Sequence, residues 1–376
     1  MKILFTGGGT GGHFYPIIAV AEKLNKMLER EKIAHVELFY MSTEPYNERL
    51  LYDNKIQFKK ITAGKLRAYF SLLNIRDLFI TAWGIIKTIC TMFFLYPDVV
   101  FGKGGYASFP VLVAARFFRI PVIIHESDTV PGRVNTWAGK FATKIAISYP
   151  EAAQYFPHDR IALTGNPMRE EVLSVTGKDA IRELNLEPGI PVILVLGGSQ
   201  GAQIINEVMI TLSPQLVEHY QIIHQTGETH MRATEVTVDG LIGNNPHGSR
   251  YHVYGYLNSL TMKMAAEVAT IVISRAGSAI FEIAAWGVPA ILIPIANHIG
   301  DHQRKNAFAY ARAGGGSVIE ELNFKPSLLL EEINNLITDE PKRLVMKKAA
   351  QEFTRGDAAE KISRELIAIV LKHKLN

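Results

Sequence analysis

The sequence has a single cysteine, Cys90, among its 376 residues. One cysteine forms no disulfide within the chain and no cysteine-based metal cage, so we expect a reducing compartment. No Asp-x-Asp pair occurs, which leaves a carboxylate-held divalent metal at a diphosphate without obvious ligands. The sequence also lacks a lysine-bearing phosphate loop, which argues against a nucleoside triphosphatase.

The sequence also lacks a large excess of one charge sign and a long uninterrupted apolar run. Lys and Arg number 40 against 36 Asp and Glu, which leaves a formal charge of +4. A nucleic-acid partner is not expected, because a surface that follows a phosphate backbone needs a denser basic field. Glycine at position 7 interrupts the amino terminus before a secretion signal could form. Lys87 divides the apolar stretch 78–96 into two runs, each shorter than the ~20 residues that cross a bilayer, so we expect it to lie on a membrane rather than span it.

The chain contains enough apolar material for more than one folded domain. Apolar residues make up 48% and charged residues 20%, and at roughly 150 residues per domain the length predicts two or three domains. Short β-branched segments alternate with longer amphipathic ones, which is typical of parallel α/β sheets covered on both faces. We expect strands at 2–6, 35–41, 98–101, 121–125 and 144–148, and then at 191–196, 220–225, 270–274 and 290–294.

The two series of strands begin alike. The strand at 2–6 runs into the glycine-rich turn 7–12, and the strand at 191–196 runs into the similar turn 197–202. The repetition predicts two Rossmann-like domains, 1–165 and 166–355, with the joint near the Gly- and Pro-containing segment 164–167. A final amphipathic helix at about 358–371, within 356–376, is expected to pack back on the first domain.

The first glycine turn matches G-x-G-x-x-G, a pattern that lets an anion approach the amides at a helix start. A dinucleotide-binding protein would add an acid at the end of the second strand, but Glu37 lies inside that strand and Glu44 beyond it. The glycines could also only tighten a strand-to-helix turn. His13, where the helix begins, is a candidate general base near neutral pH or, alternatively, a hydrogen-bonding residue of the helix start.

The second half offers groups that bind rather than transfer protons. Ser199 in the turn 197–202 suits a phosphate oxygen, as does a helix starting near Ser278. Glu282 could accept hydrogen bonds from a ribose diol or serve only as an ordinary acid of a first helical turn. A further helix start at 301–306 offers polar groups to a sugar ring. In the first half, His125 and Glu126 form a second acid–base candidate, or a buried structural pair.

Seven motifs occur in the order of one known family. They are 8–13, 104–108, 125–126, 166–169, 197–202, 274–278 with Glu282, and Gln303 with Asn306. On these motifs the chain resembles, from end to end, the MurG family of N-acetylglucosaminyltransferases of peptidoglycan synthesis. The resemblance implies the GT-B fold, with two Rossmann-like domains facing a central cleft, and a peripheral enzyme at the cytoplasmic face of the bacterial membrane.

The resemblance also implies a reaction. N-acetylglucosamine would move from UDP-N-acetylglucosamine to the C4 hydroxyl of the muramyl sugar of undecaprenyl-linked lipid I, with inversion, to give lipid II; no metal and no cofactor would be needed. His13 would be the leading base, with Glu126 as the other catalytic candidate. The donor-binding residues would be Thr10, Gly11, Gly12, Asp128, Arg169, Ser199, Leu257, Ala276, Gly277, Ser278, Ala279, Glu282 and Gln303. Of these, the resemblance implies that Arg169, Ser199 and the amides from Ala276 to Ala279 hold the diphosphate. It also implies that Leu257 backs the uracil and that Gln303 meets the N-acetylglucosamine ring. The acceptor-side residues would be Gly104, Tyr106, Ser108 and His125.

Three positions depart from the family pattern. Asp128 stands where an asparagine is expected, and His302 where a glutamine commonly precedes Gln303. The stretch from Gly277 to Glu282 is one residue shorter than in many members. These departures bear on individual donor contacts more than on the reaction.

The apolar stretch fits a lipid-linked acceptor. Its large side chains include Phe79 and Trp83, and cations lie beside it at Lys65, Arg67, Arg76 and Lys87. Apolar side chains next to cations are typical of an interfacial anchor for anionic lipids, although core helices also account for many such residues. Three other functions remain open: a sugar-nucleotide epimerase of the same architecture, an NAD-dependent oxidoreductase, and a non-catalytic membrane scaffold.

Overall fold

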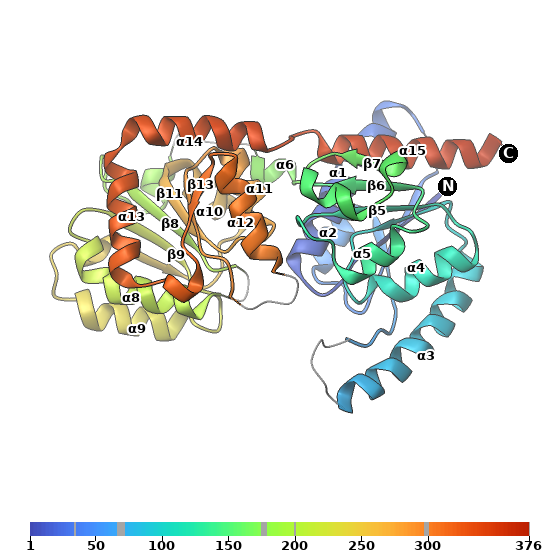
Figure 1. Cartoon of the computed structure of the whole chain (residues 1–376), viewed down its shortest axis with the longest axis horizontal. Helices are drawn as coiled ribbons and strands as arrows, with labels where there is room; N and C mark the ends of the chain where they lie inside the picture. Colours follow the sequence, from blue (N-terminus) through green and yellow to red (C-terminus); the bar gives the residue numbers. More distant parts are fainter. Residues whose placement is uncertain (34, 66–71, 174–178, 199–200, 297–300, 376) are drawn as a thin grey trace. The chain divides into compact units, whose positions relative to one another are not determined.

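The computed structural model describes the chain except residues 34, 66–71, 174–178, 199–200, 297–300 and 376. The chain forms two compact units, each a parallel sheet with helices on both faces (Figure 1). Unit 1 comprises Met1–Arg169 with Arg355–Asn376, and unit 2 comprises Glu170–Thr354. The sequence placed the first boundary after residue 165 and assigned the last helix to the first domain. The predicted α/β class with two Rossmann-like domains is confirmed.

Unit 1 is built on a seven-stranded sheet in which every pairing is parallel. Its central strands are buried on both faces, which explains their nearly continuous apolar sequences. In spatial order the strands are β3 (Ile56–Lys60), β2 (Glu37–Ser42), β1 (Lys2–Thr6), β4 (Val99–Gly102), β5 (Val122–Glu126), β6 (Lys144–Ile147) and β7 (Ile161–Leu163).

Alternate residues of these strands point to two separate cores. Ile3 and Phe5 of β1 pack with α1 (Gly11–Arg30) and α15 (Ala358–Leu375), whereas Leu4 packs with α4 (Ser108–Phe117) on the other face. The remaining helices of unit 1 are α2 (Glu48–Asp53), α3 (Leu72–Leu95), α5 (Arg133–Ala138) and the short η1 (Pro150–Tyr155) and η2 (His158–Arg160).

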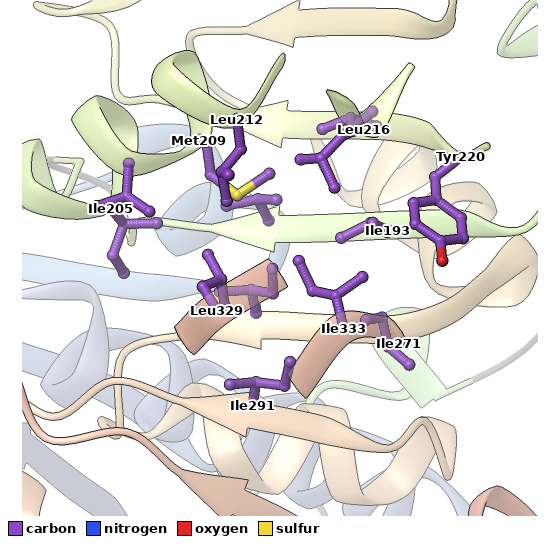
Figure 2. Close-up of a cluster of buried hydrophobic side chains, with 14 of the residues drawn as sticks. Ile193, Ile205, Met209, Leu212, Leu216, Tyr220, Ile271, Ile291, Leu329 and Ile333 are labelled. Carbon is purple, nitrogen blue, oxygen red and sulfur yellow. The ribbon is translucent and has the colours of Figure 1, made fainter. Parts of the chain in front are cut away.

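Unit 2 repeats the same strand order with six parallel strands. They are β10 (Tyr251–Tyr254), β9 (Gln221–Gln225), β8 (Val192–Leu196), β11 (Ala269–Ser274), β12 (Ala290–Leu292) and β13 (Gly316–Val318). Figure 2 shows one core of this unit, where Met209 and Leu212 of α8 (Gln203–Leu216) and Ile333 of α13 (Pro326–Thr338) meet Ile193 and Ile271 of the sheet.

The opposite face of the unit 2 sheet has its own core. It includes residues of α10 (Ser259–Val268), α11 (Ala279–Trp286) and α12 (His302–Arg312). The other helices are α6 (Glu170–Leu173), α7 (Ala180–Glu183), α9 (Met231–Ile242), α14 (Glu340–Phe353), η3 (Gly248–Arg250) and η4 (Glu321–Asn323). The site is described from the described residues of the connections at the carboxyl ends of the strands.

The apolar stretch forms one helix. Lys87 divides its apolar sequence into two runs, but α3 continues through that residue as a single helix of 24 residues. By length and composition alone, its segment Ile75–Leu95 is sufficient to cross a membrane. Helical hydrogen bonds tolerate a lysine on an exposed face, so a charge interrupts the apolar run without interrupting the helix.

Candidate functional site

In each unit the predicted site residues follow the carboxyl ends of parallel strands. In unit 1 most of them follow β1 and β4 or lie at the end of β5, and Arg169 follows β7; in unit 2 the described ones follow β10, β11 and β12. The chain leaves β1 toward β2 on one side, whereas β4 lies on the other, so the β1–β4 pair is a topological switch point. Ligands of open α/β sheets bind at such points, which makes the turns after β1 and β4 the natural centre of a site in unit 1.

The turns after β1 and β4 lie directly against each other. Thr6 at the end of β1 pairs with Gly102 at the end of β4. A Cβ atom added to Gly8 would lie 2.6 Å from Cβ of Ala107, so the two turns approach closely enough to require glycine. The predicted donor residues Thr10, Gly11 and Gly12 therefore lie in the same region as the predicted acceptor-side residues that follow β4.

His13 is the third residue of α1, and its ring is partly exposed although protein groups surround it closely. Its Nδ1 is hydrogen-bonded to the hydroxyl of Thr10 at 2.9 Å. Desolvation, together with the ammonium of Lys103, lowers the pKa of His13 to about 4, although Asp128 and the backbone of Gly8 oppose the shift. The imidazole is therefore neutral at pH 7, the form that can accept a proton.

The second candidate base, Glu126, holds a loop together. Its buried carboxylate accepts hydrogen bonds from the backbone N–H groups of Asp128 (3.0 Å) and Gly132 (3.1 Å) and from Nδ2 of Asn135 (2.9 Å). Burial and the neighbouring Asp128 raise the pKa of Glu126. Because its oxygens already serve three donors of the β5–α5 loop, the geometry favours His13 over Glu126 as a base.

The four predicted acceptor-side residues differ in what they can reach. His125 is fully buried, and its Nε2–H donates to the carbonyl of Gly165 at 3.0 Å, so an acceptor contact by this ring does not fit its burial. Ser108 is also buried and donates to the carbonyl of Gly105 at 2.8 Å. Tyr106 is partly exposed and bonded to the hydroxyl of Thr43 at 3.2 Å. Gly104 contributes backbone at the end of β4.

Lys103 is a charged residue of this region that the sequence analysis did not single out. Its side chain is 1% exposed, and Nζ has no hydrogen-bond partner among the described residues. Burial lowers the pKa of Lys103 to about 8, while Glu126 and Asp128 oppose the shift. A lysine between two glycines directly after a buried strand is the signal that could have identified it.

Arg169 lies at the end of the first segment of unit 1. Its guanidinium stacks over the ring of Tyr15 at 4.6 Å from the centroid, which fixes a partly exposed cation near the start of α1. Ser199, which is also predicted to hold the donor diphosphate, lies outside the described residues. The remaining residues predicted for that role belong to unit 2.

The turn from β11 into α11 carries the unit 2 candidates. Ser278 is the N-cap residue of α11, whose helical residues begin at Ala279 and include Glu282 in the first turn. Gly277 is partly exposed, whereas Ala276 is buried and its carbonyl accepts a hydrogen bond from Nδ2 of Asn306 at 3.3 Å. The exposed amides of a helix start suit an anion, so this turn can hold a phosphate with Glu282 close by.

Leu257 and Gln303 occupy different settings. Leu257, predicted to back the uracil, is 2% exposed and follows β10. Gln303, predicted to meet the sugar, is partly exposed, and its Oε1 accepts a hydrogen bond from the N–H of Ile295 at 3.2 Å. That bond orients the amide and leaves its NH₂ group as the group suited to a sugar hydroxyl.

Arg275 and Glu321 form a largely buried ion pair that secures the turns after β11 and β12. Nη1 and Nη2 of Arg275 donate to the two carboxylate oxygens at 3.2 and 3.3 Å. The same guanidinium donates to the carbonyl of Ile293, and Glu321 accepts from the N–H of Ala296. The bidentate geometry gives a stiff support next to the Ala276–Ala279 turn. Within the described part of the chain, no group of three or more His, Cys, Asp or Glu side chains could hold a metal ion.

Comparison with known proteins identifies relatives over the full length. Residues 3–147 match the glycosyltransferase family 28 N-terminal domain, and residues 192–362 match the glycosyltransferase family 28 C-terminal domain. A Geobacter sulfurreducens protein named UDP-N-acetylglucosamine-N-acetylmuramyl-(pentapeptide) pyrophosphoryl-undecaprenol N-acetylglucosamine transferase is 36% identical over 378 residues, or 100% of both chains. A protein of the same name from Natranaerobius thermophilus is 34% identical over 98% of this chain and 100% of its own.

Solved structures of two enzyme classes share the fold. The crystal structure of Acinetobacter baumannii MurG has a TM-score of 0.70 and 26% identity, covering 96% of this chain and 98% of that one. A UDP-GlcNAc 2-epimerase from Neisseria meningitidis, bound to UDP-GlcNAc, also has a TM-score of 0.70, with 15% identity over 98% of this chain and 100% of its own. The architecture alone therefore does not separate a transferase from an epimerase.

Proposed function

Because the chain belongs to the family of UDP-N-acetylglucosamine-N-acetylmuramyl-(pentapeptide) pyrophosphoryl-undecaprenol N-acetylglucosamine transferases, we propose that it converts lipid I to lipid II. N-acetylglucosamine moves from its UDP donor to the C4 hydroxyl of the muramyl sugar. The family resemblance expected from the motifs is confirmed. The observation that carries the proposal is identity of 34–36% to these transferases over essentially the whole chain. The epimerase, whose TM-score equals that of the Acinetobacter baumannii structure, is only 15% identical.

His13 is the base in this proposal. The acceptor hydroxyl gives its proton to the neutral imidazole as its oxygen bonds to the anomeric carbon, and the bond from that carbon to the diphosphate oxygen breaks. UDP leaves with the electron pair, and the configuration inverts because the hydroxyl attacks the face of the anomeric carbon opposite the leaving diphosphate. Thr10 orients the ring through Nδ1. Asp128 favours the imidazolium that forms, because it raises the pKa of His13, whereas Lys103 keeps the resting imidazole neutral.

Groups of unit 2 hold the donor in this proposal. The helix-start amides from Ala276 to Ala279 neutralise the diphosphate, which accumulates charge as the sugar departs. The guanidinium of Arg169 is a further cation of the kind that binds a diphosphate. Glu282 accepts hydrogen bonds from the ribose hydroxyls, and Leu257 packs against the uracil. The amide of Gln303, oriented by Ile295, donates to the N-acetylglucosamine ring.

We also propose that α3 attaches the enzyme to the membrane surface. Its apolar face is exposed: Trp83 is 64%, Phe79 70% and Phe94 83% exposed. Arg76 and Lys87 are exposed on the same helix.

Phe117, at the end of α4, extends this apolar surface. Its ring contacts that of Phe118, which in turn contacts the ring of Phe93 on α3. Large apolar side chains with flanking cations suit an anionic lipid surface, where the lipid-linked acceptor is found. Lys65 is also exposed, and Arg67 lies outside the described residues.

The opposite face of α3 supports attachment rather than crossing. It buries Asp77, Thr81 and Thr88 against the protein, and Thr81 and Thr88 donate to carbonyls within the helix. A Cβ atom added to Gly84 would lie 1.9 Å from the carbonyl oxygen of Thr62, so the helix packs closely on the chain before it. Crossing a bilayer would expose the buried Asp77 carboxylate to lipid, which is costly.

Transfer of labelled N-acetylglucosamine from its UDP donor to a short-chain lipid I analogue tests the proposal. We expect a labelled lipid-linked disaccharide with EDTA present and stoichiometric release of UDP. His13→Ala should reduce transfer by about 10²- to 10⁴-fold, because it removes the base, while UDP binding persists. Turnover of the UDP-sugar without labelled acceptor would instead favour the epimerase, and undiminished transfer by His13→Ala would exclude that residue as the base.

A further inference from the structure

Gln225, the last residue of β9, joins the connections that follow both neighbouring strands. Its side chain is 4% exposed. Nε2 donates to the carbonyl oxygen of Gly198, in the turn after β8, at 3.2 Å. Oε1 accepts from the backbone N–H of Leu257, in the segment after β10, at 3.1 Å. One planar amide thus links two segments that are far apart in the sequence.

Backbone hydrogen bonds reinforce the same junction. The N–H of Gly197 donates to the carbonyl of Gln225 at 3.3 Å, and the N–H of Thr226 donates to the carbonyl of Tyr254 at 2.9 Å. Asn206 of α8 donates to the carbonyl of Thr226 at 3.0 Å. The carboxyl ends of β8, β9 and β10 are therefore held together by a continuous set of hydrogen bonds, with the Gln225 side chain at its centre.

The two segments that Gln225 joins are expected at opposite ends of a nucleotide. The proposed function assigns Leu257 to the uracil, and the sequence motifs assign the turn after β8, of which Gly197 and Gly198 are described, to the diphosphate. A buried amide that uses both its donor and its acceptor fixes the separation of its partners, because leaving either partner unpaired carries a desolvation cost. We infer that Gln225 is a positioning residue that preorganises unit 2 for a uridine diphosphate. This inference rests on the proposed function of unit 2 as the donor-binding unit.

The same strand provides a matched control. Gln221, the first residue of β9, is 1% exposed, and its amide also bridges backbone groups. Its Oε1 accepts from the N–H of Glu187 at 2.6 Å, and its Nε2 donates to the carbonyls of Glu187 at 2.9 Å and Ile190 at 3.3 Å. At roughly 3.3 Å per residue, Gln221 lies about 13 Å from Gln225, at the amino end of the strand and away from the site.

Gln225→Met and Gln221→Met therefore separate positioning from stability. Methionine has a similar length and removes the hydrogen bonds from each position. We expect Gln225→Met to raise the dissociation constant of UDP in calorimetry, and the KM for UDP-N-acetylglucosamine, about tenfold, with kcat changed less. Gln221→Met should lower the unfolding temperature comparably but leave both constants within about twofold. The KM for the lipid I analogue should not change in either variant.

The outcomes distinguish the inference from the proposed function. UDP affinity within twofold of wild type in a folded Gln225→Met would overturn the inference, and so would equal weakening in Gln221→Met. If Gln225→Met does not fold, Gln225→Asn replaces it, since the shorter amide cannot reach both partners and should weaken UDP binding likewise. Wild-type protein that binds UDP but transfers no sugar would contradict the proposed reaction. The role of Gln225 would still be decided, because calorimetry compares the UDP affinities of the variants without any transfer. Wild-type protein that does not bind UDP would overturn both.

Discussion

The charge on the His13 imidazole depends on two side chains of opposite sign. Lys103 lowers the pKa of His13, and Asp128 raises it. Both act on the ring as nearby charges, and burial keeps the interaction from being screened by water. Replacing each charge by a neutral side chain of similar size should therefore change the pH dependence of the reaction in opposite directions.

The acid limb of the pH–rate profile is the measurement. Transfer requires neutral His13, so kcat/KM should fall as the pH drops through the pKa of that residue, about 4 in the wild type. Lys103→Met removes the cation, which raises this pKa and moves the limb to higher pH. Asp128→Asn removes the anion and moves the limb to lower pH. Limbs that move together, or remain unchanged in folded variants, would be inconsistent with His13 as the titrating base.

The residues most informative about the site were not all accessible from the sequence. The glycine turns and His13 follow from their position after apolar strands, because strand ends place such turns at the edge of a parallel sheet. Lys103 could be located by the same argument, but its burial could not. The role of Gln225 depends on Leu257, 32 positions away, and no local pattern encodes a partner at that separation. Likewise, Glu126 has the chemistry of a base, and only its three hydrogen-bond donors reveal that it organises a loop.

At the scale of a secondary-structure element, α3 has the reverse of the usual amphipathic pattern. Its buried side carries Asp77, Thr81, Gly84 and Thr88, while its exposed side carries large apolar residues. A helix of a water-soluble domain normally buries its apolar stripe. The small and polar side chains allow close packing on the protein, and the apolar face is left exposed.

Replacing part of this face with charge should abolish membrane attachment. We expect the Phe79→Glu/Trp83→Glu double variant to lose binding to anionic vesicles in flotation assays by at least tenfold, because two carboxylates must enter or face an anionic interface. Transfer to a water-soluble short-chain acceptor should stay within about threefold of wild type, since neither residue belongs to the site.

A second pair of exposed apolar residues serves as the control. Leu344 and Val345 on α14 are 60% and 70% exposed. The Leu344→Glu/Val345→Glu variant adds the same charge and should bind vesicles as the wild type does. Equal loss in both double variants would indicate that net charge governs binding, and no loss in the α3 variant would exclude its apolar face as the attachment surface.

The strands show where sequence patterns suffice and where they do not. All nine predicted strands exist, with ends that differ by at most two residues. The four unpredicted strands, β3, β7, β10 and β13, are the four edge strands of the two sheets. Edge strands are covered less completely; β3, for example, is Ile-Gln-Phe-Lys-Lys, and most of its side chains are at least partly exposed. The long apolar runs that identify central strands are therefore absent at the edges.

At the scale of the whole molecule, the last helix connects distant parts of the sequence within unit 1. Ser363 of α15 donates to the carbonyl of Val20 in α1 at 3.1 Å, and Glu360 pairs with Lys23 at 3.2 Å. Ile362 and Leu366 are buried in the same core as β1. Unit 1 thus includes a helix that follows unit 2 in the sequence, and the two cores of unit 2 contain no residue of α15.

This arrangement predicts that damage to α15 destabilises one unit selectively. Leu366 is fully buried in the unit 1 core, whereas Leu371 on the same helix is 40% exposed. Leu366→Ala should lower the stability of unit 1 by about 2–5 kcal/mol through cavity formation, and Leu371→Ala by less than about 0.5 kcal/mol. Hydrogen exchange should accelerate in β1, β4 and β5 of Leu366→Ala but not in β8, β9 and β11, because unit 2 retains both of its own cores. Accelerated exchange throughout both sheets would instead mean that the two units unfold as one cooperative body.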